Sequence, residues 1–600
     1  MNITFIEDEV INPDPKNEKK EFVIENGSLI ACNNRRLETV IIPDGILAIE
    51  ESVFEGMTSI KEVILPESIK IICDKVFANC KNLKKINLPS GLTRLQNKVF
   101  FNCEGLRQIT LPQSLTFIGD DCFALSSIES VKIPDSVEYI GEGAFRQSNL
   151  KDAFVPKSTR HLGSKAFFNC CDLEKLILEG CDIEIPEAFC DADYNLKTID
   201  LSNIKSIGDH AFYCCSKLSI DRIPANVKYV GDNAFAKTNI KNLIIEDLRA
   251  YHFSSSVFAE SNIESVQINV KLPSPYDKVL HRCIPTEMFY GCKKLKNVTF
   301  TGNTERLDSI EKCAFAKTGL TSIDIPKNTT VICSYAFNDC VKLSKISLPD
   351  TLKTIEQYAF NNCGLSEIII PDSVHSIGDC CFYNCKNLQH VQFSKNITIV
   401  PYYCFKDCEE LESFETTEKI QKVEQFAFYG CAIKEFDFSS VTSIGSHAFQ
   451  CSAIENVVFP ENLVINNKSD QPYNTDGAFM DCFNLTSVDF SRCKHVTQIP
   501  CSMFEGCFNL KHVELNENIV FFDSRCFYST AIDSMTFPKN TSWIDNKSFG
   551  NLKLKNVEFK KDTNPNIVIL KAFHGTTIEN LTIPRSLYQK YETSLRETCC

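Results

Sequence analysis

Cysteine is abundant in this sequence, with 31 Cys among 600 residues. A thiol can bind a metal, form a disulfide or act in redox chemistry. Two C-x3-C pairs have the spacing that a zinc site can use. They are Cys381 with Cys385 and Cys404 with Cys408. Other Cys are adjacent, as at Cys380 and Cys381, which suits zinc ligation poorly. Because the repeat described below accounts for the spacing, we expect buried, reduced thiols and no metal site.

Histidine offers a second route to chemistry, and the chain has ten His. His210 and His447 lie two residues before a recurring Phe, at a position that we expect to face solvent rather than act as a general base. The sequence contains no G-x-x-x-x-G-K-[ST] loop, no G-x-G-x-x-G and no H-E-x-x-H motif. It therefore predicts a protein without enzymatic activity and without a cofactor.

Composition narrows the class of protein further. The 63 basic and 77 acidic residues give a net charge of −14, which argues against nucleic-acid binding because phosphate contacts need a basic surface. With 43% hydrophobic and 23% charged residues the chain is globular. Phe outnumbers Tyr 44 to 17 and there is one Trp, so we expect one structural position to be reused many times.

The ends of the chain carry few targeting signals. Residues 1–17 lack the charged and apolar segments of a secretory signal, and no apolar run reaches the 18 residues that a transmembrane helix needs. Cys599 and Cys600 end the chain and allow weak lipid anchoring, although an unmodified, frayed end is the favoured interpretation.

A Phe that mostly follows Ala, Val or Cys recurs along the chain, mostly at intervals of 22 or 23 residues. A fixed period of this length indicates a stack of repeats. We call these 23 positions the Phe anchors: Phe54, Phe77, Phe100, Phe123, Phe145, Phe167, Phe189, Phe212, Phe235, Phe258, Phe289, Phe315, Phe337, Phe360, Phe382, Phe405, Phe428, Phe449, Phe479, Phe504, Phe527, Phe549 and Phe573.

Two further columns keep the same register. Cys lies three residues after the anchor in 12 of 23 repeats, as at Cys363, and Pro lies eleven residues before it in 11, as at Pro349. Composition alone predicts about one of each. The Cys column has a possible role in redox sensing, but an apolar environment raises the pKa of a thiol and suppresses its reactivity, so we favour packing.

One repeat reads L-x-x-I-x-I-P-x-x-V-x-x-I-G-x-x-A-F-x-x-C-x-x, as from Leu343 to Cys363. The I-x-I segment alternates like a strand, and Pro stops the hydrogen-bond ladder after it. V-x-x-I can form a second extended piece, and the Gly, as at Gly378, permits a tight corner. Asp after the Gly, as at Asp379, can cap a short helical turn that carries A-F-x-x-C.

A unit of this size cannot bury its own apolar face, so neighbouring repeats must stack. The sequence predicts an α/β repeat, mostly parallel β with short helical turns, in a single solenoid of about 23 coils over residues 21–598. Residues 21–40 are expected to form a hairpin that caps the first coil, and residues 586–598 a helix that caps the last. Residues 1–20 are expected to be a disordered tail.

The pattern L-x-x-I-x-I-P…I-G-x-x-A-F-x-x-C resembles the leucine-rich repeats of the BspA-like surface antigens of bacteria and parasitic protozoa, from about Phe22 to about Leu595. The resemblance implies a right-handed leucine-rich-repeat solenoid that displays a protein-binding surface, often for adhesion to host proteins or other cells. The family offers no catalytic residues to carry over.

The exposed strand position between the two Ile of the repeat becomes acidic from Phe405 onward, and it is expected to line a concave face. We call its five acids the acidic column: Glu415, Asp437, Asp489, Glu514 and Glu558. Acids one strand spacing apart repel, which favours a basic partner or a bound cation, although a solvated negative face is the plainer interpretation.

Two inserted loops fall between strand and anchor, at Lys271–Pro285 and Glu461–Gly477. Such insertions often mark the binding side of a solenoid, but neutral drift in a permissive loop explains them equally well. A protein partner is therefore expected at the concave face or at these loops, with no nucleic acid.

Two functions stay open. The resemblance favours a cell-surface or secreted antigen that mediates adhesion to host or matrix proteins. The missing signal peptide and the Cys content favour an intracellular, cytoplasmic scaffold or adaptor that binds a cytosolic protein.

Overall fold

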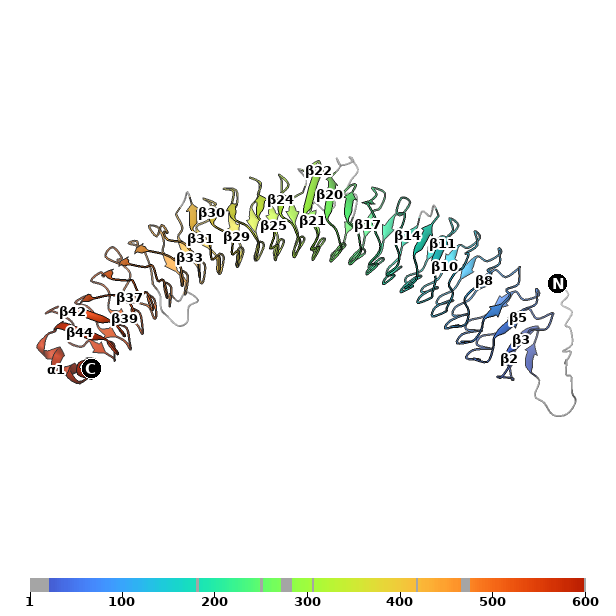
Figure 1. Ribbon diagram of the computed structural model, residues 1–600, viewed down its shortest axis with the longest axis horizontal. Helices are drawn as coiled ribbons and strands as arrows, with labels where there is room; N and C mark the ends of the chain where they lie inside the picture. Colours follow the sequence, from blue (N-terminus) through green and yellow to red (C-terminus); the bar gives the residue numbers. More distant parts are fainter. Residues whose placement is uncertain are drawn as a thin grey trace. The chain divides into compact units, whose positions relative to one another are not determined.

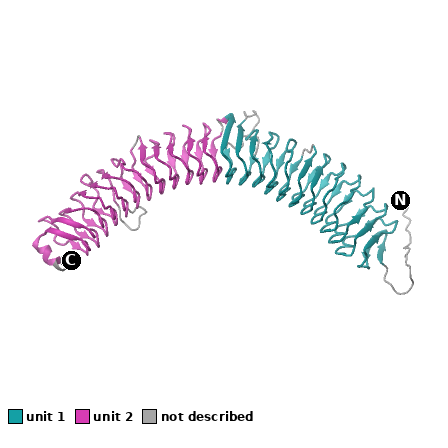
Figure 2. Cartoon of the chain, in the orientation of Figure 1, with its two compact units in different colours: residues 1–303 teal, residues 304–600 magenta. Residues whose placement is uncertain are grey.

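A computed structural model describes residues 21–179, 183–248, 252–270, 283–304, 307–416, 419–465 and 475–597 of the chain. The chain forms two compact units, Met1–Asn303 (unit 1) and Thr304–Cys600 (unit 2) (Figure 2). Within each unit, short parallel strands lie side by side in successive coils (Figure 1). The fold is a parallel-strand solenoid of about 23 coils, as the repeat predicts.

Each coil has up to two strands, one before the Pro position and one before the anchor. In unit 1 the strands of the first row are β3 Thr39–Ile41, β5 Glu62–Ile64, β7 Lys85–Ile86, β11 Asp152–Val155, β13 Lys175–Leu178, β16 Arg222–Ile223, β18 Asn242–Ile245, β20 Ser265–Val270 and β22 Asn297–Gly302. The strands of the second row are β4 Ala48–Ile49, β6 Ile71–Ile72, β8 Arg94–Leu95, β9 Phe117–Ile118, β10 Tyr139–Ile140, β12 His161–Leu162, β14 Glu184–Ile185, β15 Ser206–Ile207, β17 Tyr229–Val230, β19 His252–Phe253 and β21 Cys283–Ile284.

Unit 2 repeats this arrangement. Its first row is β24 Ser322–Asp324, β26 Lys345–Ser347, β28 Glu367–Ile369, β30 His390–Phe393, β32 Ser413–Thr416, β35 Asn456–Val458, β36 Ser487–Asp489, β38 His512–Glu514, β40 Ser534–Phe537, β42 Lys553–Phe559 and β44 Thr577–Thr582. Its second row is β23 Ser309–Ile310, β25 Val331–Ile332, β27 Thr354–Ile355, β29 Ser376–Ile377, β31 Ile399–Val400, β33 Lys422–Val423, β34 Ser443–Ile444, β37 Gln498–Ile499, β39 Phe521–Phe522, β41 Trp543–Ile544 and β43 Val568–Ile569.

Within each sheet the strands that follow β1 pair in parallel and in register, so each side chain lies beside its counterpart in the next strand. In β11 and β13, Ala153 pairs with Leu176 and Val155 with Leu178, and all four side chains are buried. The residues between them point away from the core. The alternation in the sequence therefore sets which side chains the solenoid buries and which it displays.

The anchors form continuous rows of rings in the core. Phe337, Phe360, Phe382 and Phe405 are fully buried and stacked, with ring centroids 5.4, 5.5 and 5.4 Å apart along the row. Offset stacking of aromatic rings adds to the free energy gained by burying them. This row explains the excess of Phe in the composition.

The Cys column adds a second link between coils. All twelve thiols donate a hydrogen bond to the carbonyl of the anchor position in the preceding coil, as Cys363 Sγ does to Phe337 O at 3.1 Å. Burial raises the pKa of eleven of these thiols, to about 12 for Cys80 and Cys385 and about 11 for Cys340. They are protonated packing groups at neutral pH and are poor nucleophiles.

The segment around the anchor differs from the helical turn that the sequence suggests. The residues two before and two after the anchor adopt left-handed backbone angles, as at Lys98 (φ 58°) and Asn102 (φ 56°) around Phe100. An α-helix cannot continue through such residues, so the anchor lies between hydrogen-bonded turns. Within the described ranges, α1 Arg585–Glu597 is the one α-helix.

The Gly that lies four residues before the anchor does not form the tight corner that the sequence suggests. At Gly119, Gly141 and Gly378 the backbone φ is not positive, but an added Cβ would lie 2.2–2.7 Å from a backbone N of the preceding coil. Glycine at these positions therefore allows two coils to approach closely.

We expect Gly378→Ala to lower the free energy of unfolding by about 2 kcal/mol, because its Cβ would lie 2.2 Å from Gln357 N. Glu356 fills this place in the preceding coil, so the coil spacing can adapt and the cost stays moderate. Urea unfolding followed by circular dichroism measures the change. Gly91→Ala is the control, because its Cβ would meet only Lys70 Nζ, at 3.1 Å. Equal effects of the two substitutions would contradict the close-approach explanation.

One coil departs from the anchor register. Cys190 N donates to Ala211 O just as Phe212 N donates to Ala234 O, so Cys190 occupies the anchor place and Phe189 the small-residue place before it. The anchor assignment at Phe189 is therefore wrong by one residue. Phe189 remains buried, with its ring at 88° to that of Phe167.

This shift places Asp193 in the Cys column, three residues after Cys190. Its Oδ1 accepts a hydrogen bond from Cys170 N, and its Oδ2 is buried without a partner among the described residues. Burial raises the pKa of Asp193 well above its usual value.

The two ends of the described chain carry distinct elements. β1 Phe22–Glu25 pairs antiparallel with β2 Ser28–Cys32 across a turn at Asn26 and Gly27, both with positive φ, and β2 then pairs with β4. At the other end α1 places Leu587 in the core, and Tyr591 Oη donates to Ile567 O at 2.5 Å. The tail expected at residues 1–20 lies outside the described residues.

Candidate functional site

The acidic column lies on the first strand row of unit 2. Glu415, Glu514 and Glu558 are exposed on β32, β38 and β42, and Asp489 is half-buried on β36. Asp437 is exposed but lies in a segment without strand pairing. Four of the five acids therefore occupy the strand positions that the alternation predicts.

The column is not continuous. Asp489 and Glu514 are direct neighbours in the parallel register of β36 and β38. Val458 precedes Asp489, and Thr536 lies between Glu514 and Glu558 and donates its hydroxyl to Glu558 Oε2 at 3.3 Å. One adjacent acid pair within this sheet is weaker support for a cation site than an unbroken row.

Two of the carboxylates accept hydrogen bonds from backbone amides close to them in the sequence. Asp437 Oδ1 accepts a hydrogen bond from Ser439 N at 2.8 Å, and Asp489 Oδ1 accepts one from Ser491 N at 2.7 Å. The hydrogen bonds around Ser439 lower the pKa of Asp437. Such side-chain turns need no external ligand. Glu514, in contrast, has no hydrogen bond from its carboxylate to any described residue, so it is the most available acid of the column.

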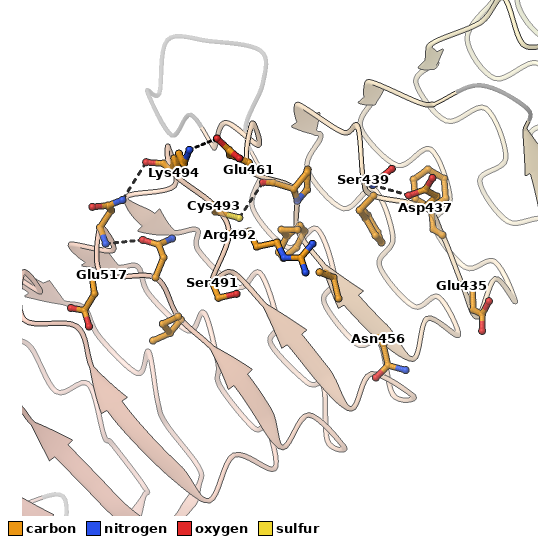
Figure 3. Close-up of a pocket in the computed structure, with 18 of the residues that line it drawn as sticks. Glu435, Asp437, Ser439, Asn456, Glu461, Ser491, Arg492, Cys493, Lys494 and Glu517 are labelled. Atoms are coloured by element: carbon orange, nitrogen blue, oxygen red, sulfur yellow. Dashed lines mark hydrogen bonds and ion pairs between the residues drawn. The ribbon is translucent and has the colours of Figure 1, made fainter.

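A groove of about 990 Å³ lies beside Asp437 and carries both signs of charge (Figure 3). Lys434, Arg492 and Lys494 line it together with Glu461 and Glu517. Lys494 forms an ion pair with Glu461, and its backbone O accepts a hydrogen bond from Asn518 Nδ2 at 3.3 Å. The strand alternation did not predict these bases, because Lys434 precedes the strand position of its coil and Arg492 and Lys494 follow β36, where the repeat pattern specifies no charge.

The described part of the chain offers no cluster of metal-ligating side chains. No group of three or more His, Cys, Asp and Glu side chains there is arranged to hold a metal ion. The C-x3-C pairs contain fully buried thiols that belong to the packing of the coils. His447 stacks on the Phe426 ring, with ring centroids 4.9 Å apart, instead of facing solvent freely.

Parts of the other expected sites lie outside the described residues. These are 271–282 and 466–474 of the inserted loops, and the terminal Cys599 and Cys600. In the described ranges no helix is both long and apolar enough to cross a bilayer.

A sequence profile of the BspA type leucine rich repeat region, which spans six copies of the repeat, matches most of the chain. The matched residues are 27–151, 70–190, 116–218, 183–309, 280–389, 375–469 and 475–598. The chain belongs to the BspA-type leucine-rich repeat family. No curated protein matches it. As a BspA-type chain it is a protein-binding repeat scaffold, of a fold that is typically non-catalytic.

Several solved structures resemble this BspA-type solenoid. A leucine-rich repeat protein from Bacteroides ovatus is 23% identical, covers 67% of this chain and 97% of its own, and has a TM-score of 0.47. A leucine rich cell surface protein from Faecalibacterium prausnitzii is 19% identical, covers 86% of this chain and 96% of its own, and has a TM-score of 0.26.

Proposed function

We propose that this BspA-type protein is displayed at the cell surface or secreted and mediates adhesion by binding a host or matrix protein. The observation that carries the proposal is that each coil has a buried set of side chains and a separate exposed set. Buried Phe and Cys fill the interior, while the outward side chains of the first strand row remain exposed and vary from coil to coil. Variable exposed positions on a constant frame are what a repeat protein uses to recognise a partner.

Within unit 2 the acidic column is the proposed contact surface, with Glu514 and Glu558 as its main charges. Both are exposed on strands, and the Glu514 carboxylate accepts no hydrogen bond from a described residue. A basic partner would pair with these carboxylates and relieve the repulsion between Glu514 and Asp489.

The alternative is an intracellular scaffold that binds a cytosolic protein. It is favoured by the buried, free thiols of the Cys column, because a reducing compartment keeps such thiols reduced. Labelling intact cells with a membrane-impermeant biotin reagent separates the two locations. Surface labelling supports adhesion, whereas labelling only after lysis would exclude it.

Charge reversal tests the acidic column. We expect the double variant Glu514→Lys and Glu558→Lys to bind a fluorescein-labelled peptide of alternating Lys and Ser about tenfold more weakly, and with a smaller salt dependence, in fluorescence anisotropy. Glu409→Lys is the control, because Glu409 is equally exposed but is paired with Lys386 away from the strands. Unchanged affinity of the double variant would refute this contact surface.

A further inference from the structure

We propose that unit 1 carries a second docking surface, which binds an extended acidic segment with aliphatic side chains from a partner protein. The surface is the exposed face of the first strand row from β5 to β13. It differs from the acidic column in position and in charge, so this inference goes beyond the proposed adhesion surface and does not depend on it.

A groove of about 1440 Å³ follows this face. It crosses β5, β7, β11 and β13 and the two coils between β7 and β11. In those two coils Gln108, Ser130 and Asp152 pair as isolated parallel bridges, and Asp152 then pairs with Lys175. The groove therefore spans six consecutive coils, of which the first two pair with each other and the last four pair in parallel from Gln108 to Lys175.

Apolar side chains occupy outward positions of this groove that usually hold polar residues. Ile64 on β5 is 44% exposed and Ile177 on β13 is 38% exposed, and both line the groove. Phe154 on β11 lies between them and is half-buried. On the coil before β5, Ile41 on β3 occupies the same position as Ile64 and is 61% exposed. Asn87, Thr110 and Lys132 hold the same position in the coils between Ile64 and Phe154, so the apolar residues form two patches, and exposed apolar patches are typical of a protein contact surface.

The groove is basic on a chain of net charge −14. Five bases and two acids line it. Arg107 is already neutralised, because it pairs at 2.9 Å with Glu129, which also pairs with Lys151. The remaining bases, Lys84, Lys85, Lys132 and Lys175, have no ion pair with a described residue. Unpaired lysines among exposed aliphatic groups favour an acidic partner.

The spacing of the lysines specifies the form of that partner. Lys85, Lys132 and Lys175 each lie two coils apart, which is about 10 Å along the stack at about 4.8 Å per strand. An extended chain covers that distance in about three residues. The fitting segment therefore has an acid at every third position, with aliphatic residues between them that meet Ile64, Phe154 and Ile177.

Nucleic acid is the other polyanion that a basic groove attracts. The aliphatic side chains favour a peptide, because single-stranded nucleic acid is usually bound on exposed aromatic faces. Phe154 is the one aromatic residue that lines this groove.

The test uses the full chain under reducing conditions and a fluorescein-labelled peptide, Ser-Asp-Leu-Thr-Asp-Leu-Thr-Asp-Leu-Thr-Asp-Ser, in fluorescence anisotropy. We expect Lys85→Glu with Lys132→Glu to weaken binding at least tenfold, and Ile177→Ser to weaken it severalfold. The control is Lys386→Glu, an exposed base of unit 2 paired with Glu409, which should leave binding unchanged. Circular dichroism confirms that each variant is folded.

Four results would overturn the proposal: wild-type affinity in the Lys85 and Lys132 double variant, wild-type affinity in Ile177→Ser, equal binding of a peptide with Lys in place of Asp, or tighter binding of oligo-dT. The last result would assign the groove to nucleic acid. Because the readout is confined to unit 1, loss of adhesion through Glu514 and Glu558 would not affect it.

Discussion

Replacing Phe360 with Ala is expected to lower the free energy of unfolding by about 4 kcal/mol. Phe360 is fully buried, and its ring stacks on Phe337 at 5.4 Å and on Phe382 at 5.5 Å. The substitution removes one ring from the row and leaves a cavity bounded by two others. Neighbouring coils cannot move together to fill it, because their strands are held in register by hydrogen bonds.

Phe508→Ala is the control, because Phe508 is 59% exposed although it also stacks on another ring, that of Phe483. Its loss should cost less than about 1 kcal/mol. Urea unfolding monitored by circular dichroism, with hydrogen exchange of residues 337–385 as a local measure, compares the two variants. Similar costs for both would mean that stacking, and not burial, holds the coils together.

Replacing Asp193 with Cys is expected to stabilise the chain by about 3 kcal/mol at pH 7. Asp193 is a buried carboxyl group in a column that has a thiol in 12 of its repeats, and its Oδ2 has no partner among the described residues. The new thiol would donate a hydrogen bond to the carbonyl of the preceding anchor position, as the twelve thiols of the Cys column do. Cys170 N keeps its hydrogen bond to Phe167 O at 3.4 Å, so no new unpaired group is created.

The same carboxyl group makes stability depend on pH. Burial raises the pKa of Asp193, so the folded chain retains a proton that the unfolded chain has lost above about pH 4. The stability that Asp193 contributes is therefore complete below the unfolded pKa and falls as the pH rises toward the folded pKa. The slope in this window is about 1.4 kcal/mol per pH unit.

Urea unfolding and hydrogen exchange of residues 165–215 at pH 4.5, 5.5, 6.5 and 7.5 measure this effect. The advantage of Asp193→Cys over wild type should grow with pH. Asp193→Asn is the matched variant, because it keeps the volume and removes the titration, and it should share the flatter profile. Parallel pH profiles of wild type and both variants would contradict a buried, titrating carboxyl group at this position.

The sequence determined the fold largely through one residue type. The Phe anchors located the coils because nearly every coil buries a Phe at the same position. The regular spacing of these Phe residues is visible in the sequence. The register failed at Phe189, where a neighbouring Cys190 takes the anchor place. The residue three after Phe189 is Ala192, which gives no warning of the shift, and only the hydrogen bonds between coils place Asp193 in the Cys column.

The sequence predicted the local backbone conformation less well than it predicted the length of the repeat. The anchor segment looked helical because A-F-x-x-C has helical spacing, yet residues such as Lys98 are held in a left-handed conformation by bonds to the next coil. Gly378 looked like a corner residue, but its role depends on Gln357 in the preceding coil. Both features arise from contacts between coils, which a single repeat does not reveal.

The candidate surfaces were predictable only in part. Alternation placed Glu514 and Glu558 on exposed strand positions correctly. It did not reveal that Asp437 and Asp489 are engaged in their own turns, because that depends on the direction of each side chain. The basic groove of unit 1 also escaped notice, because its lysines come from different strand positions, and only the stacked coils bring them together.

The direction of the strand hydrogen bonds has a mechanical consequence. They run from one coil to the next, so tension that separates the coils of a unit pulls along these bonds and breaks them a few at a time. Each coil that detaches releases about 23 residues, or roughly 80 Å of extended chain. A solenoid with this construction would lengthen stepwise under load, one coil at a time.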